Sequence, residues 1–175
     1  MAVKLYEFEG RELFRRYGIP VTEYGVAGSA EEARRLSEEF GGRVVVKAQV
    51  LVAGRGKAGG VKVAETPARA AEIAAEMLGS SIKGERVKTV IVTPYTEIAR
   101  ELYLGFIVDR ARRKSVLIAS GEGGVDIEVL AKTSPSNVLK LEVDPLTGLR
   151  DYQIRRAVRF MHLSDKLAED AVKIL

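Results

Sequence analysis

The sequence predicts a fold of the α/β (α+β) class, in which helices and strands alternate along the chain. Amphipathic segments with recognisable N-terminal caps alternate with short runs of β-branched residues, and glycines mark most of the boundaries between them. Neither an internal repeat nor a low-complexity segment interrupts this order. A chain of 175 residues is long enough to bury a core but holds at most one or two small domains.

Boundary signals define the helices of the first half. Ser29 and Glu32 have the spacing at which each side chain caps a backbone amide near the start of a helix. Thr66 is a suitable N-cap, and Pro67 after it suits the first helical position. These signals, with glycines at the ends, predict helices at about 8–17, 29–41 and 66–79. One side of the first helix is apolar: Leu13, Phe14 and Tyr17.

Valine-rich and alternating segments define the strands. Residues 44–46 and 61–63 are predicted to pair as a hairpin around a glycine-rich loop. Further strands are predicted at 89–92, 102–108 and 115–119, the last two joined by a charged turn, and helices return near 157–161 and after Ser164. In the strand at 102–108, alternation places four apolar side chains on a face that we expect to be core: Leu102, Leu104, Phe106 and Val108.

Composition excludes several classes of function. The 28 basic and 24 acidic residues give a net charge of +4 without a basic arm, so we expect no nucleic-acid partner. There is no cysteine, and the one histidine, His162, is expected between two helices with no catalytic or metal-binding role. Because neither a secretory signal nor a membrane-length apolar run is present, we expect a cytoplasmic protein that does not enter a membrane.

The glycine-rich loop is the most informative segment. Four glycines and two cations, Arg55 and Lys57, lie within residues 54–60, and Lys47 ends the strand before them. Glycines let backbone amides approach phosphate oxygens, while cations offset the phosphate charge. The alternative is an exposed hairpin whose glycines only turn the chain, with Lys47 emerging into water. The density of glycines and cations favours a phosphate-binding loop.

Known glycine motifs fit this loop poorly. Its spacing matches G-x-G-x-x-G, but a dinucleotide site requires a helix directly afterwards, where this chain has a predicted strand. A P-loop is excluded because no Gly-Lys-Ser/Thr ends the segment. A protein kinase places its lysine on the strand after the loop, whereas Lys47 precedes it, and the other kinase motifs are missing.

Two later features could serve a nucleotide site. Glu101, near the start of a strand and on its more polar side, could accept hydrogen bonds from a ribose or orient a cation, although a lone acid is more often a surface residue. The loop 120–128 combines glycines and acids after a strand, as active-site loops often do, but a plain turn is equally admissible. No acidic pair that would bind magnesium follows this loop, so we predict no metal-binding residue in this sequence.

Ordered blocks along nearly the whole chain resemble the beta subunit of succinyl-CoA synthetase, a family of the ATP-grasp superfamily. The blocks that carry the resemblance are LFRRYGIP at 13–20, VVKAQV at 45–50, AGRGKAGGVKV at 53–63, IARELYLG at 98–105, EGGVDIE at 122–128 and VDPLTG at 143–148. The resemblance implies an ATP-grasp fold with an incomplete second lobe. It also implies a first lobe at about 1–100, with the phosphate lid, and the start of the second at 101–175.

The resemblance also assigns residues. It implies that Lys47 and the turn of Gly54, Arg55 and Gly56 bind nucleotide phosphates, that Thr96 lies beside the base between the lobes, and that Glu101 contacts the nucleotide. One position departs from the family pattern: relatives commonly carry glutamate where this chain has Thr93, which puts the contact there in doubt.

The family reaction joins succinate and coenzyme A while cleaving ATP or GTP with Mg²⁺, or runs in reverse, through a phosphohistidine on an alpha subunit. The resemblance therefore implies an alpha-subunit partner, magnesium ligands outside this chain, and no catalysis by this chain alone. Two alternatives stay open: another ligase that forms a nucleoside diphosphate, acting on acetate, malate or citrate, and a noncatalytic nucleotide-binding module. The choice of ATP or GTP, the oligomer and the direction of flux are also open.

Overall fold

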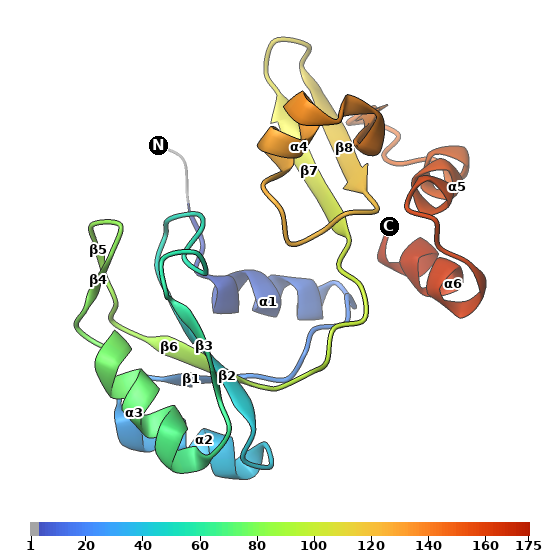
Figure 1. The fold of residues 1–175 in the computed structure, drawn as a ribbon. Helices are drawn as coiled ribbons and strands as arrows, with labels where there is room; N and C mark the ends of the chain where they lie inside the picture. Colours follow the sequence, from blue (N-terminus) through green and yellow to red (C-terminus); the bar gives the residue numbers. More distant parts are fainter. Residues whose placement is uncertain (1–3) are drawn as a thin grey trace. The chain divides into compact units, whose positions relative to one another are not determined.

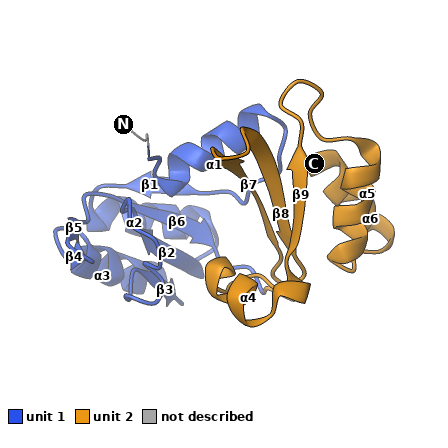
Figure 2. Ribbon diagram, turned by 90° about the horizontal axis from the view of Figure 1, so that it is seen from above, with its two compact units in different colours: residues 1–97 blue, residues 98–175 orange. Residues whose placement is uncertain are grey.

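A computed structural model describes residues 4–175, which fold into two compact units (Figures 1 and 2). The first unit ends at Glu97 and the second begins at Ile98. Each unit has its own sheet and its own apolar core, so each can be described by itself.

The first unit is built on a four-stranded antiparallel sheet. Its strands are β1 (Gly25–Ala27), β6 (Val90–Pro94), β2 (Val44–Ala48) and β3 (Val61–Ala64), in that spatial order. The hairpin predicted from the two valine runs is confirmed as β2 and β3, in which Lys47 is opposite Val61. The short β1, which has only three residues, was not predicted.

The helices of this unit are α1 (Glu7–Arg16), α2 (Ala30–Glu39) and α3 (Pro67–Met77). The caps predicted at Ser29 and Thr66 are confirmed, because each hydroxyl accepts a hydrogen bond from a backbone amide three residues on, at 3.2 Å. The reciprocal half of the first cap differs from the prediction. Glu32 accepts a hydrogen bond from the amide of Gly28, at 2.7 Å, and not from that of Ser29.

The core lies on one face of the sheet, where α2 and α3 pack (Figure 1). Val44, Val46 and Ala48 of β2 are fully buried there, together with Ile73 and Ala74 of α3. Alternation along β2 turns Lys47 to the opposite face, over which α1 lies. The core therefore fixes the direction in which Lys47 points.

Helix α1, predicted with an apolar side, does not bury that side within the described residues. It contributes no buried residue, and its apolar side chains are exposed: Leu13, Phe14 and Tyr17. Its polar first turn is the part that faces the sheet, as the ion pair between Glu7 and Lys47 shows. A small hairpin, β4 (Ser81–Ile82) and β5 (Glu85–Arg86), completes the unit and was not predicted.

The second unit has a three-stranded antiparallel sheet in the order β7 (Tyr103–Asp109), β8 (Lys114–Ser120) and β9 (Leu139–Val143). Its helices are α4 (Ile127–Thr133), the 3₁₀ turn η1 (Pro135–Asn137), α5 (Asp151–Phe160) and α6 (Asp165–Ile174). The strands expected at 102–108 and 115–119 are confirmed with their charged turn. His162 lies between α5 and α6, as expected, whereas α4, η1 and β9 were missed.

The face of β7 that the alternation assigned to the core is exposed, so that prediction was wrong. Phe106 and Val108 are 54% and 72% exposed. The reason is that β7 is an edge strand of this sheet, and α5 packs over β8 and β9. Leu117 and Ala119 of the central strand supply the buried positions on that face, together with Ala157 of α5.

Candidate phosphate-binding site

Lys47 stands at the end of β2 on the sheet face that α1 covers. Its ammonium nitrogen is 3.7 Å from Oε1 of Glu7, in the first turn of α1, and its side chain is 23% exposed. The next strand residue, Ala48, is held by a hydrogen bond from its amide to the carbonyl of Gly60, at 2.8 Å. This bond closes the base of the loop between β2 and β3, so Lys47 and the loop form one structural element.

The loop folds back on itself through a few backbone hydrogen bonds. The amides of Ala58 and Gly60 both donate to the carbonyl of Arg55, at 3.1 and 2.9 Å. By contrast, the amides of Gly54, Arg55 and Gly56 donate no hydrogen bond to another described residue. Unpaired backbone amides beside cations are the arrangement that binds phosphate oxygens in anion-binding loops.

The fold requires glycine at some positions of the loop, for different structural reasons, but not at all of them. Gly54 and Gly59 adopt positive φ angles of +71° and +79°, which side chains disfavour. At Gly60 a Cβ would lie 3.1 Å from the Arg55 carbonyl oxygen and 2.8 Å from a methyl carbon of Ile82. Gly56 has neither constraint, since the nearest atom to a Cβ would be 3.8 Å away. The fold therefore does not require glycine at 56, whereas close approach of a ligand would.

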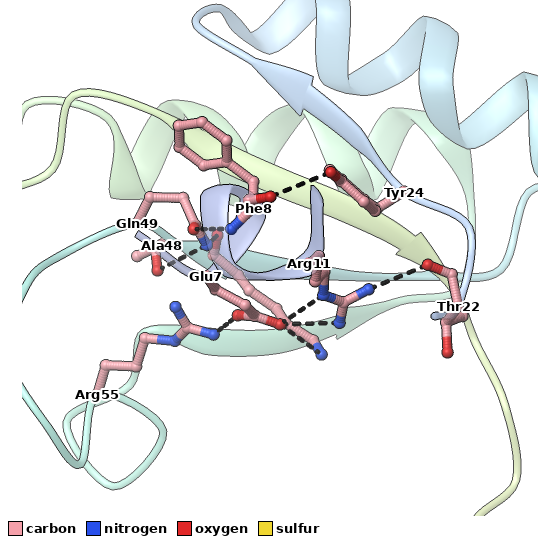
Figure 3. Close-up of polar contacts among 9 residues, drawn as sticks. Glu7, Phe8, Arg11, Thr22, Tyr24, Ala48, Gln49 and Arg55 are labelled. Atoms are coloured by element: carbon pink, nitrogen blue, oxygen red, sulfur yellow. Dashed lines mark hydrogen bonds and ion pairs between the residues drawn. The ribbon is translucent and has the colours of Figure 1, made fainter. Parts of the chain in front are cut away.

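Arg55 points from the loop toward Glu7, and the Arg55 guanidinium forms an ion pair with Glu7 Oε2 (Figure 3). Oε1 of the same carboxylate accepts hydrogen bonds from Arg11 Nε and Nη2, at 3.0 and 2.8 Å. With Lys47, three cations thus surround one carboxylate. We call these four residues, Glu7, Arg11, Lys47 and Arg55, the cation cluster.

The cluster is poorly solvated. The side chains of its four members are between 16% and 24% exposed. Burial lowers the pKa of Lys47, and the nearby Arg11 charge lowers it further. Burial also lowers the pKa of Arg55. The pKa of Arg11 is lowered too, because the effect of burial is larger than the opposing effect of Tyr24, which raises it. Since these shifts reflect an environment that disfavours the charged forms, an added anion would stabilise the three cations.

Two further contacts hold the cluster in place. The side-chain oxygen of Gln49 accepts a hydrogen bond from the amide of Phe8, at 3.4 Å, which ties the first turn of α1 to the end of β2 (Figure 3). The Lys83 ammonium, from the β4–β5 turn, donates to the carbonyl of Ala53, at 2.7 Å, next to Gly54. Lys57, which the sequence also suggested as a phosphate ligand, is exposed and forms no ion pair with another described residue.

The other two predicted site residues, Thr96 and Glu101, stand in sequence on either side of the boundary between the two units. Thr96 is exposed and follows β6 by two residues, near the end of the first unit. Glu101 is exposed and precedes β7 in the second unit. The structure thus brings Lys47, Gly54, Arg55 and Gly56 together. It does not test the predicted roles of Thr96 and Glu101.

The loop 120–128 packs against Glu101 within the second unit. The Gly123 amide donates to the Glu101 carbonyl at 2.9 Å, and a Cβ on Gly123 would lie 2.6 Å from the Glu101 carbonyl carbon. Arg100, next in sequence, donates to the carbonyl of Met161 at 2.7 Å. These contacts fix the backbone at Glu101 and leave its side chain exposed. The glycine at 123 therefore has a structural reason, as the plain-turn interpretation expects.

Sequence reasoning missed Glu7 and Arg11. The only signal was their spacing of four residues, which is typical of an exposed ion pair on a helix. Only the fold shows that this pair faces Lys47 and Arg55. Over residues 4–175, no group of three or more acidic or histidine side chains is arranged to hold a metal ion, and no helix is long and apolar enough to cross a membrane.

Residues 4–175 match the sequence model of the ATP-grasp domain. The chain therefore belongs to the ATP-grasp family, in agreement with the fold predicted from its sequence.

Within this family the chain is similar to beta subunits of ADP-forming succinate–CoA ligases. It is 52% identical over 159 residues to the subunit of Pyrobaculum arsenaticum, which covers 91% of this chain and 42% of the relative. It is 50% identical over 163 residues to that of a Roseiflexus species, covering 93% and 43%. The chain thus spans less than half the length of these relatives.

Solved structures share the fold at lower identity. A dinucleotide-forming acetyl-coenzyme A synthetase of Candidatus Korarchaeum cryptofilum, in complex with coenzyme A and Ca-AMPCP, matches with a TM-score of 0.74 and 20% identity, over 98% of this chain and 78% of that one. ATP citrate lyase from Methanothrix soehngenii matches with a TM-score of 0.65 and 20% identity, over 97% and 42%. At these identities the likeness concerns the fold.

Proposed function

We propose that the cation cluster and the loop 54–56 bind the phosphates of a purine nucleotide, and that the chain is the nucleotide-handling part of the beta subunit of a succinate–CoA ligase. One observation carries the phosphate site. The fold gathers Lys47, Arg55 and Arg11 around a single carboxylate, beside a glycine turn whose amides are unpaired within residues 4–175. ATP is the nucleotide we propose, because the similar beta subunits are named as ADP-forming.

Each residue has a role in this proposal. Lys47 and Arg55 offset the phosphate charge, and the amides of Gly54, Arg55 and Gly56 donate to phosphate oxygens. Thr96 lies beside the base, and Glu101 contacts the nucleotide. Mg²⁺, for which we propose ligands beyond these 175 residues, would supply charge neutralisation at the phosphates when bound. The protein itself contributes positioning and charge complementarity.

In the whole enzyme, the γ-phosphoryl group passes to a histidine of an alpha subunit, and then to a succinate carboxylate to give succinyl phosphate. The thiol of coenzyme A displaces the phosphate, forming the thioester succinyl-CoA. We propose the alpha subunit, succinate and coenzyme A as partners, and the cytoplasm as the location. The names of relatives at about 50% identity favour succinate over acetate or citrate, which are named in solved structures at about 20% identity.

A chimeric beta subunit tests this proposal. The 159 matching residues of the Pyrobaculum arsenaticum subunit are replaced by those of this chain, and the chimera is produced with the alpha subunit of that organism. We expect ADP release over many turnovers only when ATP, succinate and coenzyme A are present together, because ATP alone can phosphorylate the histidine once. Changing Arg55 to Met in the chimera should abolish most of this activity, because Arg55 is proposed to hold phosphate.

The matched control is Arg69→Met, which removes the same charge from an exposed arginine of α3 that pairs with Glu72 at 2.7 Å. This variant should keep the activity of the chimera. A chimera that folds and binds the alpha subunit but releases no ADP would contradict the proposal. Equal losses in the two arginine variants would show that general charge matters, and would reject the assigned role of Arg55.

A further inference from the structure

Glu7 is an acid located among the cations that are proposed to bind an anionic ligand. Its Oε2 is buried and forms an ion pair with Arg55, while its Oε1 contacts Arg11 and lies 3.7 Å from Lys47. Both carboxylate oxygens are therefore engaged by cations. A phosphate group offers the same chemistry to the same donors, namely anionic oxygens that accept charge-assisted hydrogen bonds.

The charges of the cluster show why one carboxylate is not a sufficient partner. Three cations against one acid leave two formal positive charges unbalanced, and no other acid forms an ion pair with these cations among residues 4–175. The carboxylate thus satisfies the cluster only in part, and a more highly charged anion would satisfy it better.

The two sides of Glu7 differ in how firmly they are held. Arg11 is on the same helix, four residues away, and makes two hydrogen bonds to Oε1, while it also donates to the carbonyl of Thr22 at 3.2 Å. The Arg55 backbone is held by hydrogen bonds to its carbonyl, but its guanidinium has Glu7 as its one ion-pair partner among residues 4–175. Arg11 can therefore keep Glu7 in place while Arg55 turns to another anion.

We propose that Glu7 is an internal competitor of the nucleotide, whose carboxylate holds Arg55 and Lys47 until a phosphate group takes its place beside Arg55. This inference rests on the proposed function. The competition lowers the affinity for phosphates, and it keeps the two cations close to their binding geometry when no nucleotide is present. It also assists the release of product, since Glu7 re-forms its ion pair with Arg55 as the phosphate leaves.

The test compares the wild-type chain with Glu7→Gln, which keeps the size of the side chain and removes its charge. Binding of tripolyphosphate, of ATP with Mg²⁺ and of adenosine is measured by titration calorimetry. Loss of one competing ion pair should tighten the binding of tripolyphosphate and ATP about fivefold. The affinity for adenosine, which has no phosphate, should not change.

Glu12→Gln is the matched control, because it removes a charge from the same helix, where Glu12 pairs only with Arg15 and Arg16 among the described residues. It should leave the affinity for tripolyphosphate unchanged. Glu7→Asp keeps the charge but retracts it, and should fall between the wild type and Glu7→Gln. This second variant carries the test if Glu7→Gln fails to give a cooperative thermal transition.

The outcomes separate this inference from the proposed function. If the wild type binds tripolyphosphate and Glu7→Gln binds it equally or less tightly, Glu7 is a positioning residue and the inference is overturned, while the phosphate site stands. If both Glu7→Gln and Glu12→Gln bind tripolyphosphate more tightly, the gain comes from the change in net charge alone, and the inference is also overturned. If neither the wild type nor the variants bind, the phosphate site itself is rejected, and the inference with it.

Discussion

Replacing Gly56 by alanine separates the needs of the fold from those of the ligand. A Cβ at 56 would have its nearest neighbour 3.8 Å away, at ordinary contact distance, and the backbone there does not have a positive φ. The substitution should therefore leave stability unchanged or raise it by about 0.4–1 kcal/mol, through the lower entropy of the unfolded chain. By contrast, Gly60→Ala forces a Cβ to within 3.1 Å of a backbone oxygen. It should cost about 1–3 kcal/mol.

Thermal melts and ATP titrations together give the measurement. A loss of 1 kcal/mol lowers Tm by about 4–8 °C in a domain of up to about 100 residues, such as the first unit, so Gly60→Ala should melt clearly below the wild type and Gly56→Ala should not. Hydrogen bonds to charged groups contribute about 1.5–3 kcal/mol, so blocking one phosphate contact at Gly56 should weaken ATP binding at least about tenfold. Gly56→Ala with unchanged stability and unchanged ATP affinity would refute the reasoning that this glycine makes room for phosphate.

Two further predictions concern the second unit. Glu101→Gln should weaken the binding of ATP but not that of tripolyphosphate, because Glu101 could accept hydrogen bonds from the ribose, which tripolyphosphate lacks; equal losses for both ligands in calorimetry would contradict this. The amides of Leu146 and Thr147 donate to Asp144 at 2.8 and 3.2 Å and lower the pKa of its carboxyl group. A carboxyl group whose pKa is lower in the folded state than in the unfolded state, about 3.9, stabilises the fold at pH values above about 3.9. This stabilisation by Asp144 should be lost as the pH falls through its folded-state pKa. Asp144→Asn should thus reduce the acid sensitivity of unfolding, and an unchanged pH profile in denaturant titrations would count against it.

Local signals predicted much of the fold. Capping residues and valine runs are short-range features, so the starts of α2 and α3 and the hairpin of β2 and β3 followed from a few residues each. The faces of β7 did not follow from alternation. Alternation tells which side chains share a face but not which face is covered, and that depends on the order of strands in the sheet.

The site was predictable to the same extent. The loop and Lys47 could be predicted as a candidate phosphate site because such sites combine glycines and cations within a short segment. Glu7 and Arg11 were not found, because the ion pairs of Glu7 with Lys47 and Arg55 join residues at least 40 positions apart and arise only when α1 lies over β2. The same limit applies to α1 itself, because an apolar side in the sequence does not tell whether another element covers it, and here it is exposed.

Calorimetric titration of the chain with ATP in magnesium, beside Lys47→Ala and Lys62→Ala, tests the central claim most directly. Lys62 is a suitable control because it lies on the neighbouring strand and pairs with Glu76 at 2.6 Å, away from the cation cluster. The account predicts saturable binding that Lys47→Ala weakens at least about tenfold and that Lys62→Ala leaves intact. Binding that is absent from the wild type, or that the two variants weaken equally, would contradict a phosphate site at Lys47.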